Sequence, residues 1–168
     1  TTFYYVTING GSGSPKRISQ IASLNTTPDF TLNTFDDYQF HELDKTNFVK
    51  SGREFYGEPF DINNSQTFSF DFPNLIAQNV LLRTSFAGHS PGVTSSLSIK
   101  NNGVNLFTTT YNTGTNYTDD YAIDTYAQAT FTNTTGSNVS LIYNFIPANS
   151  SCAGFLNFIE LKIRTGLS

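Results

Sequence analysis

Apolar and polar residues alternate along most of this chain, and a two-residue period is typical of β-strands that bury one face. In segment 66–72 phenylalanine takes every second position, so Phe68, Phe70 and Phe72 should point to one side of a sheet. The same period recurs in segments 80–86, 97–106, 139–145 and 159–163. We therefore expect a β-sheet protein whose core is built from stripes of phenylalanine and aliphatic side chains.

Segment 97–106 contains a strong turn signal. The dipeptide Asn102-Gly103 stands between the apolar residues Ile99 and Val104. Asn-Gly between alternating apolar runs predicts a tight hairpin turn, because both central residues of that turn need a positive φ. The two arms of the segment should therefore be neighbouring antiparallel strands.

The number and spacing of these segments indicate the fold class. No segment shows a sustained 3.6-residue period with helix caps, so no helical layer is expected. About nine or ten strands with turn signals between them predict an all-β, two-sheet β-sandwich of jelly-roll type, with a closed barrel as the lesser alternative. We expect one domain over residues 1–168, in which residues 1–30 form an N-terminal strand or hairpin or the end of a preceding domain.

The composition narrows the class of protein. Only 13% of the 168 residues are charged, and the formal net charge is −4. A surface made mainly of Ser, Thr, Asn and Gln is typical of a secreted or surface-exposed protein. No basic run is longer than Lys16-Arg17, which excludes a nucleic-acid partner, and no apolar run approaches the roughly 18–20 residues that cross a bilayer.

A catalytic centre is not indicated by the residue types present. Cys152 is the only cysteine, and the only histidines are His41 and His89. A cysteine nucleophile needs a lowered thiol pKa, and no cationic residue stands near Cys152 in the sequence. We interpret Cys152 as a small, half-buried structural residue and His41 as a structural histidine, and we expect no cofactor.

Carboxylates are grouped at several places along the chain, and such loops hold calcium in many sandwich domains. The groups are Asp36 with Asp37, Glu42 with Asp44, and Asp119 and Asp120 with Asp124. None of these groups has the fixed spacing of a calcium loop. We therefore expect solvated turns and no metal site.

Two tyrosines suggest an alternative function. Tyr117 and Tyr121 fall in a loop-rich region, and exposed aromatic rings can stack on sugar rings. The chain has no Trp, which is the commonest platform residue in carbohydrate-binding modules. A carbohydrate-binding module of a secreted enzyme, with a surface glycan as its partner, is nevertheless the alternative. An enzyme in its own right is the least favoured function.

Segment 51–60 combines loop-breaking residues with charges and aromatic rings. Ser-Gly at its start and Gly57 followed by Glu58-Pro near its end enclose Phe55 and Tyr56. Arg53, Glu54 and Glu58 can pair with one another and fasten the loop to the sandwich. Alternatively, these three residues and Tyr56 are the candidates for an interaction surface that docks a neighbouring domain.

Several stretches together resemble one known family. They are FDDYQFHE at 35–42, Asp44, Asn47, SGREFYGEPF at 51–60, FSF at 68–70, FPNL at 72–75, the turn at 99–103 and FLNFIEL at 155–161. The pattern resembles the PorU family, the gingipain-like surface peptidases, or sortases, of the type IX secretion system in Bacteroidetes. It covers most of the chain from about Phe35 onward.

The resemblance implies a large, outer-membrane-associated protein on the surface of a Gram-negative bacterium. In that family a peptidase domain removes C-terminal sorting signals from secreted cargo and helps to attach the cargo to lipopolysaccharide. This chain would be the non-catalytic accessory domain that precedes the peptidase domain. It would position that domain, its cargo and other secretion components. The family's catalytic His and Cys belong to the peptidase domain, so Cys152 would not inherit the nucleophile role.

Overall fold

The computed structural model describes residues 19–23, 30–48, 50, 54–76, 79–116, 118–134 and 136–167. The chain divides into two compact units, Thr1–Thr31 and Leu32–Ser168. The described residues of the first unit belong to no helix or strand. Most of the predicted N-terminal strand or hairpin lies outside the described residues.

The second unit is made of β-strands. They are β1 (Thr34–Glu42), β2 (Pro59–Phe60), β3 (Ser65–Asp71), β4 (Asn79–His89), β5 (Ser95–Asn101), β6 (Val104–Tyr111), β7 (Ile123–Thr132), β8 (Asn138–Ile146) and β9 (Ala153–Gly166). No helix occurs among the described residues, so the predicted all-β class is confirmed. In the same part of the chain there is accordingly no apolar helix of membrane-crossing length.

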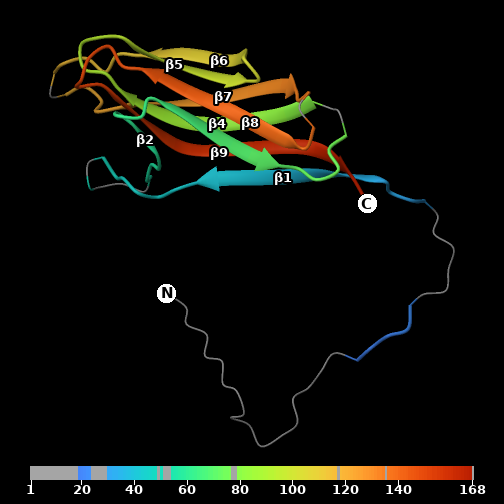
Figure 1. The fold of residues 1–168 in the computed structure, drawn as a ribbon. Coiled ribbons are helices and arrows are strands. Elements are labelled where there is room, and N and C mark those ends of the chain that lie inside the picture. The colour runs from blue at the N-terminus through green and yellow to red at the C-terminus, as the bar shows by residue number, and fades with distance from the viewer. Residues whose placement is uncertain are drawn as a thin grey trace, which may run out of the picture. The chain divides into compact units, whose positions relative to one another are not determined.

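The strands form two antiparallel sheets that lie on each other as two layers (Figure 1). The first sheet has the order β1-β9-β4-β7, with β2 also paired to β9, and the second has the order β3-β8-β5-β6. The pairs β1–β9, β3–β8, β4–β7 and β5–β6 are nested, like one long antiparallel ribbon folded over itself. This nested winding is that of a jelly roll, so the predicted two-sheet sandwich is confirmed.

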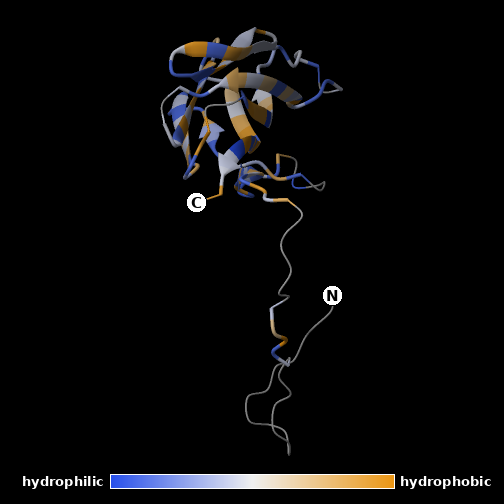
Figure 2. Cartoon of the chain, turned by 90° about the vertical axis from the view of Figure 1, so that its right-hand side faces the viewer, coloured by the Kyte–Doolittle hydropathy of each residue, from blue (hydrophilic) through white to orange (hydrophobic). Residues whose placement is uncertain are grey.

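The core lies between the sheets and contains the stripes predicted from the alternation. Hydrophobic and hydrophilic residues alternate along the strands (Figure 2). The buried stripes are Phe68, Phe70 and Phe72; Val80, Leu82, Thr84 and Phe86; Leu97 and Ile99; Val139, Leu141, Tyr143 and Phe145; and Ile159, Leu161 and Ile163. The Tyr143 hydroxyl donates to Thr84 Oγ1 at 3.0 Å, so this buried polar group is paired.

The predicted hairpin is also present. Asn102 and Gly103 connect β5 to β6 with φ angles of 48° and 80°. The β5–β6 register shifts between Ile99 and Lys100, which marks a bulge next to the turn. This irregular end of β6 lies at one edge of the second sheet.

Candidate interaction surface

Strand β1 places Tyr38 and Phe40 on the outer face of the first sheet. In the register with β9, Tyr38 and Phe40 lie opposite charged residues, whereas His41 lies opposite the buried Ile159. His41 therefore points between the sheets, where its ring centroid is 5.2 Å from that of Phe68. Phe35, opposite the buried Thr165, lies on the same side of β1 as His41, whereas Tyr38 and Phe40 face outward.

Four rings form what we call the aromatic stripe: Tyr38 and Phe40 of β1, Phe158 of β9 and Tyr126 of β7. Neighbouring ring centroids are 6.3 Å apart for Tyr38 and Phe40, 5.6 Å for Phe40 and Phe158, and 6.3 Å for Phe158 and Tyr126. The small residue Ser85 of β4 lies between Phe158 and Tyr126 in the register. Tyr38, Phe40 and Tyr126 are 46–57% exposed, so the stripe is open to solvent.

Two ion pairs flank the aromatic stripe on the same face. Arg83 Nη1 lies 3.2 Å from Glu160 Oε1, and Arg164 Nη1 lies 2.9 Å from Asp36 Oδ1. Exposed pairs of this kind contribute little to stability. Their position beside apolar rings, with both signs of charge, is the arrangement found at the rim of protein interfaces.

The described residues between β1 and β2 cover the end of this face where β9 begins. The Phe48 ring centroid lies 4.5 Å from that of Tyr56, 4.7 Å from that of Phe155 and 5.6 Å from that of Tyr121. Tyr56 and Thr46 exchange two backbone hydrogen bonds of 2.8 Å, which close the segment on itself. The outer face therefore has a covered end and an open end.

Among the predicted interaction residues, Glu58 is bound within the domain. Its Oε1 accepts a hydrogen bond from His41 Nε2 at 2.8 Å, and the two side chains are 15% and 31% exposed. Glu58 Oε2 is buried and has no hydrogen-bond partner among the described residues. The pair links the residue before β2 to β1, while Arg53, which the sequence offered as a partner, lies outside the described residues.

Glu54 and Tyr56 meet a third residue at the covered end. Tyr56 is 6% exposed, and its hydroxyl donates to Glu54 Oε2 at 3.2 Å. Burial and the nearby carboxylates of Asp124 and Glu54 raise the pKa of Tyr56. Burial and the Glu54 charge also raise the pKa of Asp124, although Ser85 Oγ donates to Asp124 Oδ1 at 2.7 Å. Among the members of this group that the structure describes, Glu54 is the exposed one.

The sugar-binding candidates are only partly placed. Tyr117 lies outside the described residues. Tyr121 is half exposed, and its ring stacks on His89 with centroids 4.3 Å apart, so one face of the ring is covered. It borders a hollow of about 460 Å³ that Asp119 and Asp120 also line.

The thiol of Cys152 has polar but uncharged partners. It lies 3.4 Å from Ser90 Oγ and 3.3 Å from Asn149 Oδ1, in a buried position. The hydrogen bonds of the two histidines are made elsewhere: His41 bonds to Glu58, and His89 bonds to the Tyr121 carbonyl oxygen. The described residues also contain no group of three His, Cys, Asp or Glu side chains placed to hold a metal ion.

The aromatic stripe was not among the residues predicted from the sequence. Its signal is present, because Tyr38 and Phe40 alternate with Gln39 and His41 in β1. The period alone does not say which of two alternating sets faces the core. The pairing with β9 decides this, and it turns the aromatic set outward.

Comparisons with known proteins identify a strong likeness in fold. No family model and no curated protein matches the chain. The crystal structure of dimeric latent PorU from Porphyromonas gingivalis contains a similar part, with a TM-score of 0.69 and 22% sequence identity. The match covers 81% of this chain and 13% of that chain. The two proteins therefore share this sandwich fold, and the chain spans only a small part of PorU.

Two carbohydrate-binding modules are more distantly similar. One is the CBM36-1 domain of a multidomain xylanase from the hindgut metagenome of Trinervitermes trinervoides, with a TM-score of 0.42, 12% identity, and coverage of 74% of this chain and 96% of the module. The other is a CBM36 module in complex with calcium and xylotriose, with a TM-score of 0.41, 11% identity, and coverage of 77% and 99%.

Proposed function

We propose that this chain is a non-catalytic β-sandwich domain of a PorU-like, gingipain-type surface protein of the type IX secretion system. Its role is to position the adjacent peptidase domain, and with it the cargo, at the outer surface of a Gram-negative cell. The open end of the first sheet's outer face is the docking surface. The peptidase chemistry belongs to the neighbouring domain.

One observation carries this proposal: the fold of the chain matches part of PorU over 81% of its own length but only 13% of PorU. A chain that corresponds to so small a part of a larger protein is suited to an accessory role. The family resemblance of the acidic and aromatic segment 35–60 supports the same assignment.

The aromatic stripe supports the docking role. Exposed aromatic rings that lie side by side are uncommon on monomer surfaces, and aromatic residues with Arg are enriched at the centres of interfaces. Tyr38, Phe40 and Tyr126 have this exposure, and Arg83 and Arg164 stand beside them. The partner we infer is a protein surface with apolar pockets and charges of both signs.

The test uses the longer protein that carries this chain. Changing Phe40→Ser together with Tyr126→Ser should lower the rate of cargo signal removal by about fivefold or more, because loss of an interface anchor costs more than about 1 kcal/mol. Ile146→Ser removes an exposed apolar residue from the second sheet and serves as the matched control. The melting temperature of the chain should change little in all variants.

Full processing activity in the Phe40 and Tyr126 variant would contradict the docking role. Equal losses in that variant and in Ile146→Ser would contradict it too. The carbohydrate-module alternative predicts a different result, namely saturable glycan binding that is abolished by Tyr117→Ala or Tyr121→Ala.

A further inference from the structure

The edge strands of the two sheets differ in how far their backbone groups are protected. β1 and β7 are the edges of the first sheet, and β3 and β6 are those of the second. β6 contains a bulge, because its register with β5 skips Leu106, and bulges protect edges from pairing with another chain. The outward side chains of β3 are small or acidic: Ser65, Thr67, Ser69 and Asp71.

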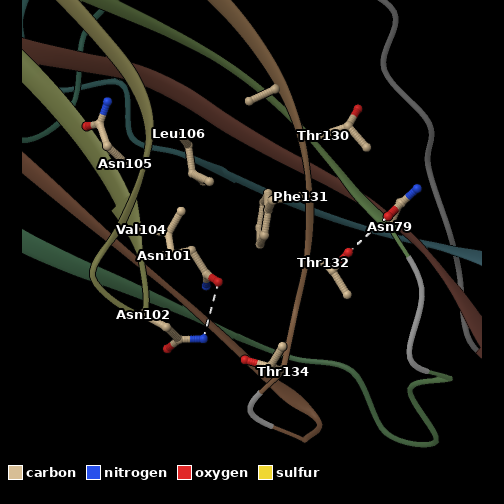
Figure 3. Close-up of a pocket in the computed structure, with 11 residues that line it drawn as sticks. Asn79, Asn101, Asn102, Val104, Asn105, Leu106, Thr130, Phe131, Thr132 and Thr134 are labelled. Atoms are coloured by element: carbon tan, nitrogen blue, oxygen red, sulfur yellow. Dashed lines mark hydrogen bonds between the residues drawn. The ribbon is translucent and has the colours of Figure 1, made fainter.

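β6 and β7 border a hollow of about 600 Å³, in which Phe131 of β7 lies between the two strands (Figure 3). The polar side chains at its border are bonded to their neighbours. Thr132 Oγ1 donates to Asn79 Oδ1 at 3.1 Å, and Asn105 Nδ2 donates to Thr108 Oγ1 at 2.9 Å. The first pair lies on the outer face of the first sheet and the second pair on that of the second sheet. In the described part of the chain, these polar groups therefore do not converge on one ligand.

Strand β1 keeps one row of backbone groups open. β9 lies on one side of it, and no described strand pairs with its other side (Figure 1). Leu167 N donates to the Asn33 carbonyl oxygen at 2.9 Å, in the same register that continues through β1 and β9. Hydrogen-bonded and non-hydrogen-bonded pairs alternate in an antiparallel ladder, so the odd-numbered residues of β1 bond to β9. The N–H and C=O groups of the even-numbered residues, such as Asp36, Tyr38 and Phe40, therefore point away from β9.

Few of the usual devices protect this free edge of β1. The strand is nine residues long with an unbroken register, and it contains neither Pro nor Lys. One protecting device is present, because Asp37 faces inward and its Oδ1 accepts a hydrogen bond from Tyr38 N at 2.8 Å. The Tyr38 carbonyl oxygen and both backbone groups of Phe40 have no partner among the described residues. Residues 38–42 therefore form the open part of the edge.

The side chains beside this edge indicate the composition of a strand that would fit it. On the outer face Tyr38 and Phe40 are 51% and 46% exposed, so an apolar residue opposite Phe40 would extend the aromatic stripe. On the inner face Asp37 lies opposite the buried Ile163. Neither Asp37 nor Glu42, at the other end of the open part, has an ion-pair partner among the described residues. A Lys or Arg near each end of an added strand would pair with these two carboxylates.

We propose that the free edge of β1 binds an extended segment of a partner polypeptide as an added antiparallel strand, with an apolar residue opposite Phe40 and a basic residue near each end. This inference rests on the docking function proposed above and deepens it, because it names the element that the partner contributes beside the aromatic stripe. In this mode of recognition main-chain hydrogen bonds provide affinity, and the alternating side chains provide specificity.

A second copy of this chain is the competing occupant, since two β1 edges could pair with each other. β1 contains Asp36, Asp37 and Glu42 but no Lys or Arg. Pairing of two such strands would bring the carboxylates of both copies together, and like charges across a strand pair are destabilising. The charge of the edge therefore favours a basic segment of a different protein or domain.

The experiment is a titration of the 168-residue chain with the synthetic peptide KTITVKT, acetylated and amidated at its ends. Its isoleucine is meant to lie opposite Phe40, and its two lysines opposite Glu42 and Asp37. The peptide should bind and shift the backbone NMR resonances of residues 36–42, whereas the acidic peptide ETITVET should bind at least about tenfold more weakly. Raising the salt concentration from about 0.05 M to about 0.5 M should weaken the binding of KTITVKT, because salt screens exposed charge pairs.

N-methylated peptides separate backbone pairing from side-chain contact. Methylation of the isoleucine nitrogen removes the N–H that would donate to the Phe40 carbonyl oxygen, and it should raise the Kd at least about tenfold. Methylation of the threonine that follows the isoleucine is the matched control, because the N–H of that residue would point away from β1. It should raise the Kd less than about threefold.

Variants of the chain test the charged ends of the edge. Asp37→Asn and Glu42→Gln should each raise the Kd of KTITVKT by about threefold or more, because each removes one charge pair with the peptide. Asp120→Asn is the matched control, since it removes the same charge from an exposed loop residue outside β1. It should leave the Kd unchanged.

The proposal is overturned if KTITVKT does not bind, if the two N-methylated peptides bind equally well, or if the chain forms a dimer that shifts the resonances of residues 36–42 without peptide. The docking function is tested separately by cargo processing in the variant with Phe40→Ser and Tyr126→Ser. Slower processing in that variant, together with no peptide binding, would overturn strand addition and leave the docking function standing.

Discussion

The outer faces of the two sheets differ, although their inner faces are built alike. The outer face of the second sheet carries mainly small polar side chains, and Ile142 and Ile146 are its apolar members. The polar ones include Ser65, Thr67 and Ser69 of β3, Ser96 and Ser98 of β5, and Ser140 and Asn144 of β8. The outer face of the first sheet carries the aromatic stripe and two ion pairs.

This difference shows that the sandwich fold does not require aromatic side chains on an outer face. Both sheets contribute buried apolar stripes to one core, and hydrophobic burial there accounts for most of the stability. The second sheet shows that a polar outer face is sufficient for this sandwich. The rings of Tyr38, Phe40 and Tyr126 are therefore available for contact with another surface.

The largest expected effect lies in the core that both sheets share. Phe70→Ala should lower the free energy of unfolding by about 3–5 kcal/mol, because it removes a ring that is only 6% exposed and leaves a cavity. Chemical denaturation of the chain measures this. Ser69→Ala, on the outer face of the same strand, should change stability by less than about 0.5 kcal/mol, and an equal loss in both variants would refute the assigned faces.

The covered end of the first sheet should show an intermediate effect. Glu58→Ala removes the hydrogen bond that Glu58 Oε1 accepts from His41 Nε2, and it should cost about 1–3 kcal/mol because His41 then loses its partner. Glu54→Ala removes a more exposed carboxylate and should cost less. A double-mutant cycle with His41→Ala should give a coupling above about 0.5 kcal/mol, and additive losses would contradict the link between β1 and β2.

The smallest change in stability should come from the substitution of Asp124, which lies near the boundary between the covered and open ends of the first sheet. Its pKa is raised by burial and by Glu54, so ionisation disfavours the folded state. The stability contribution of the protonated group is present below the unfolded pKa and is lost as the pH rises toward the folded pKa. Asp124→Asn should therefore raise the melting temperature at pH 7 by roughly 1–2 °C, a gain limited by solvent screening.

Two comparisons check whether the ionised Asp124 side chain destabilises the fold. The difference between Asp124→Asn and the unchanged chain should shrink as the pH falls through the window between the two pKa values. Asp120→Asn removes the same charge from an exposed loop residue and should leave the melting temperature nearly unchanged. A lower melting temperature for Asp124→Asn at pH 7 would show that the Ser85 hydrogen bond outweighs burial and the Glu54 charge.

Much of the fold follows from local sequence patterns. The buried stripes, such as Phe68, Phe70 and Phe72, and the Asn102-Gly103 turn are where alternation and turn chemistry predict them. The nested strand order could not be predicted in this way. It depends on pairings such as that of β1 with β9, which joins residues more than a hundred positions apart.

The surface features were less predictable than the core. The sequence draws attention to segment 35–60, but it does not indicate that the partner of Glu58 is His41 of β1. The aromatic stripe draws rings from β1, β7 and β9, so no single window of sequence contains it.

The most direct test of the docking surface is hydroxyl-radical footprinting of the longer protein and of this chain alone. Oxidation of each side chain is measured by mass spectrometry. We expect Tyr38, Phe40 and Tyr126 to be oxidised more slowly in the longer protein, while the exposed Ile146 of the second sheet is oxidised equally in both. Equal oxidation of the aromatic stripe in the two samples would contradict the proposed function.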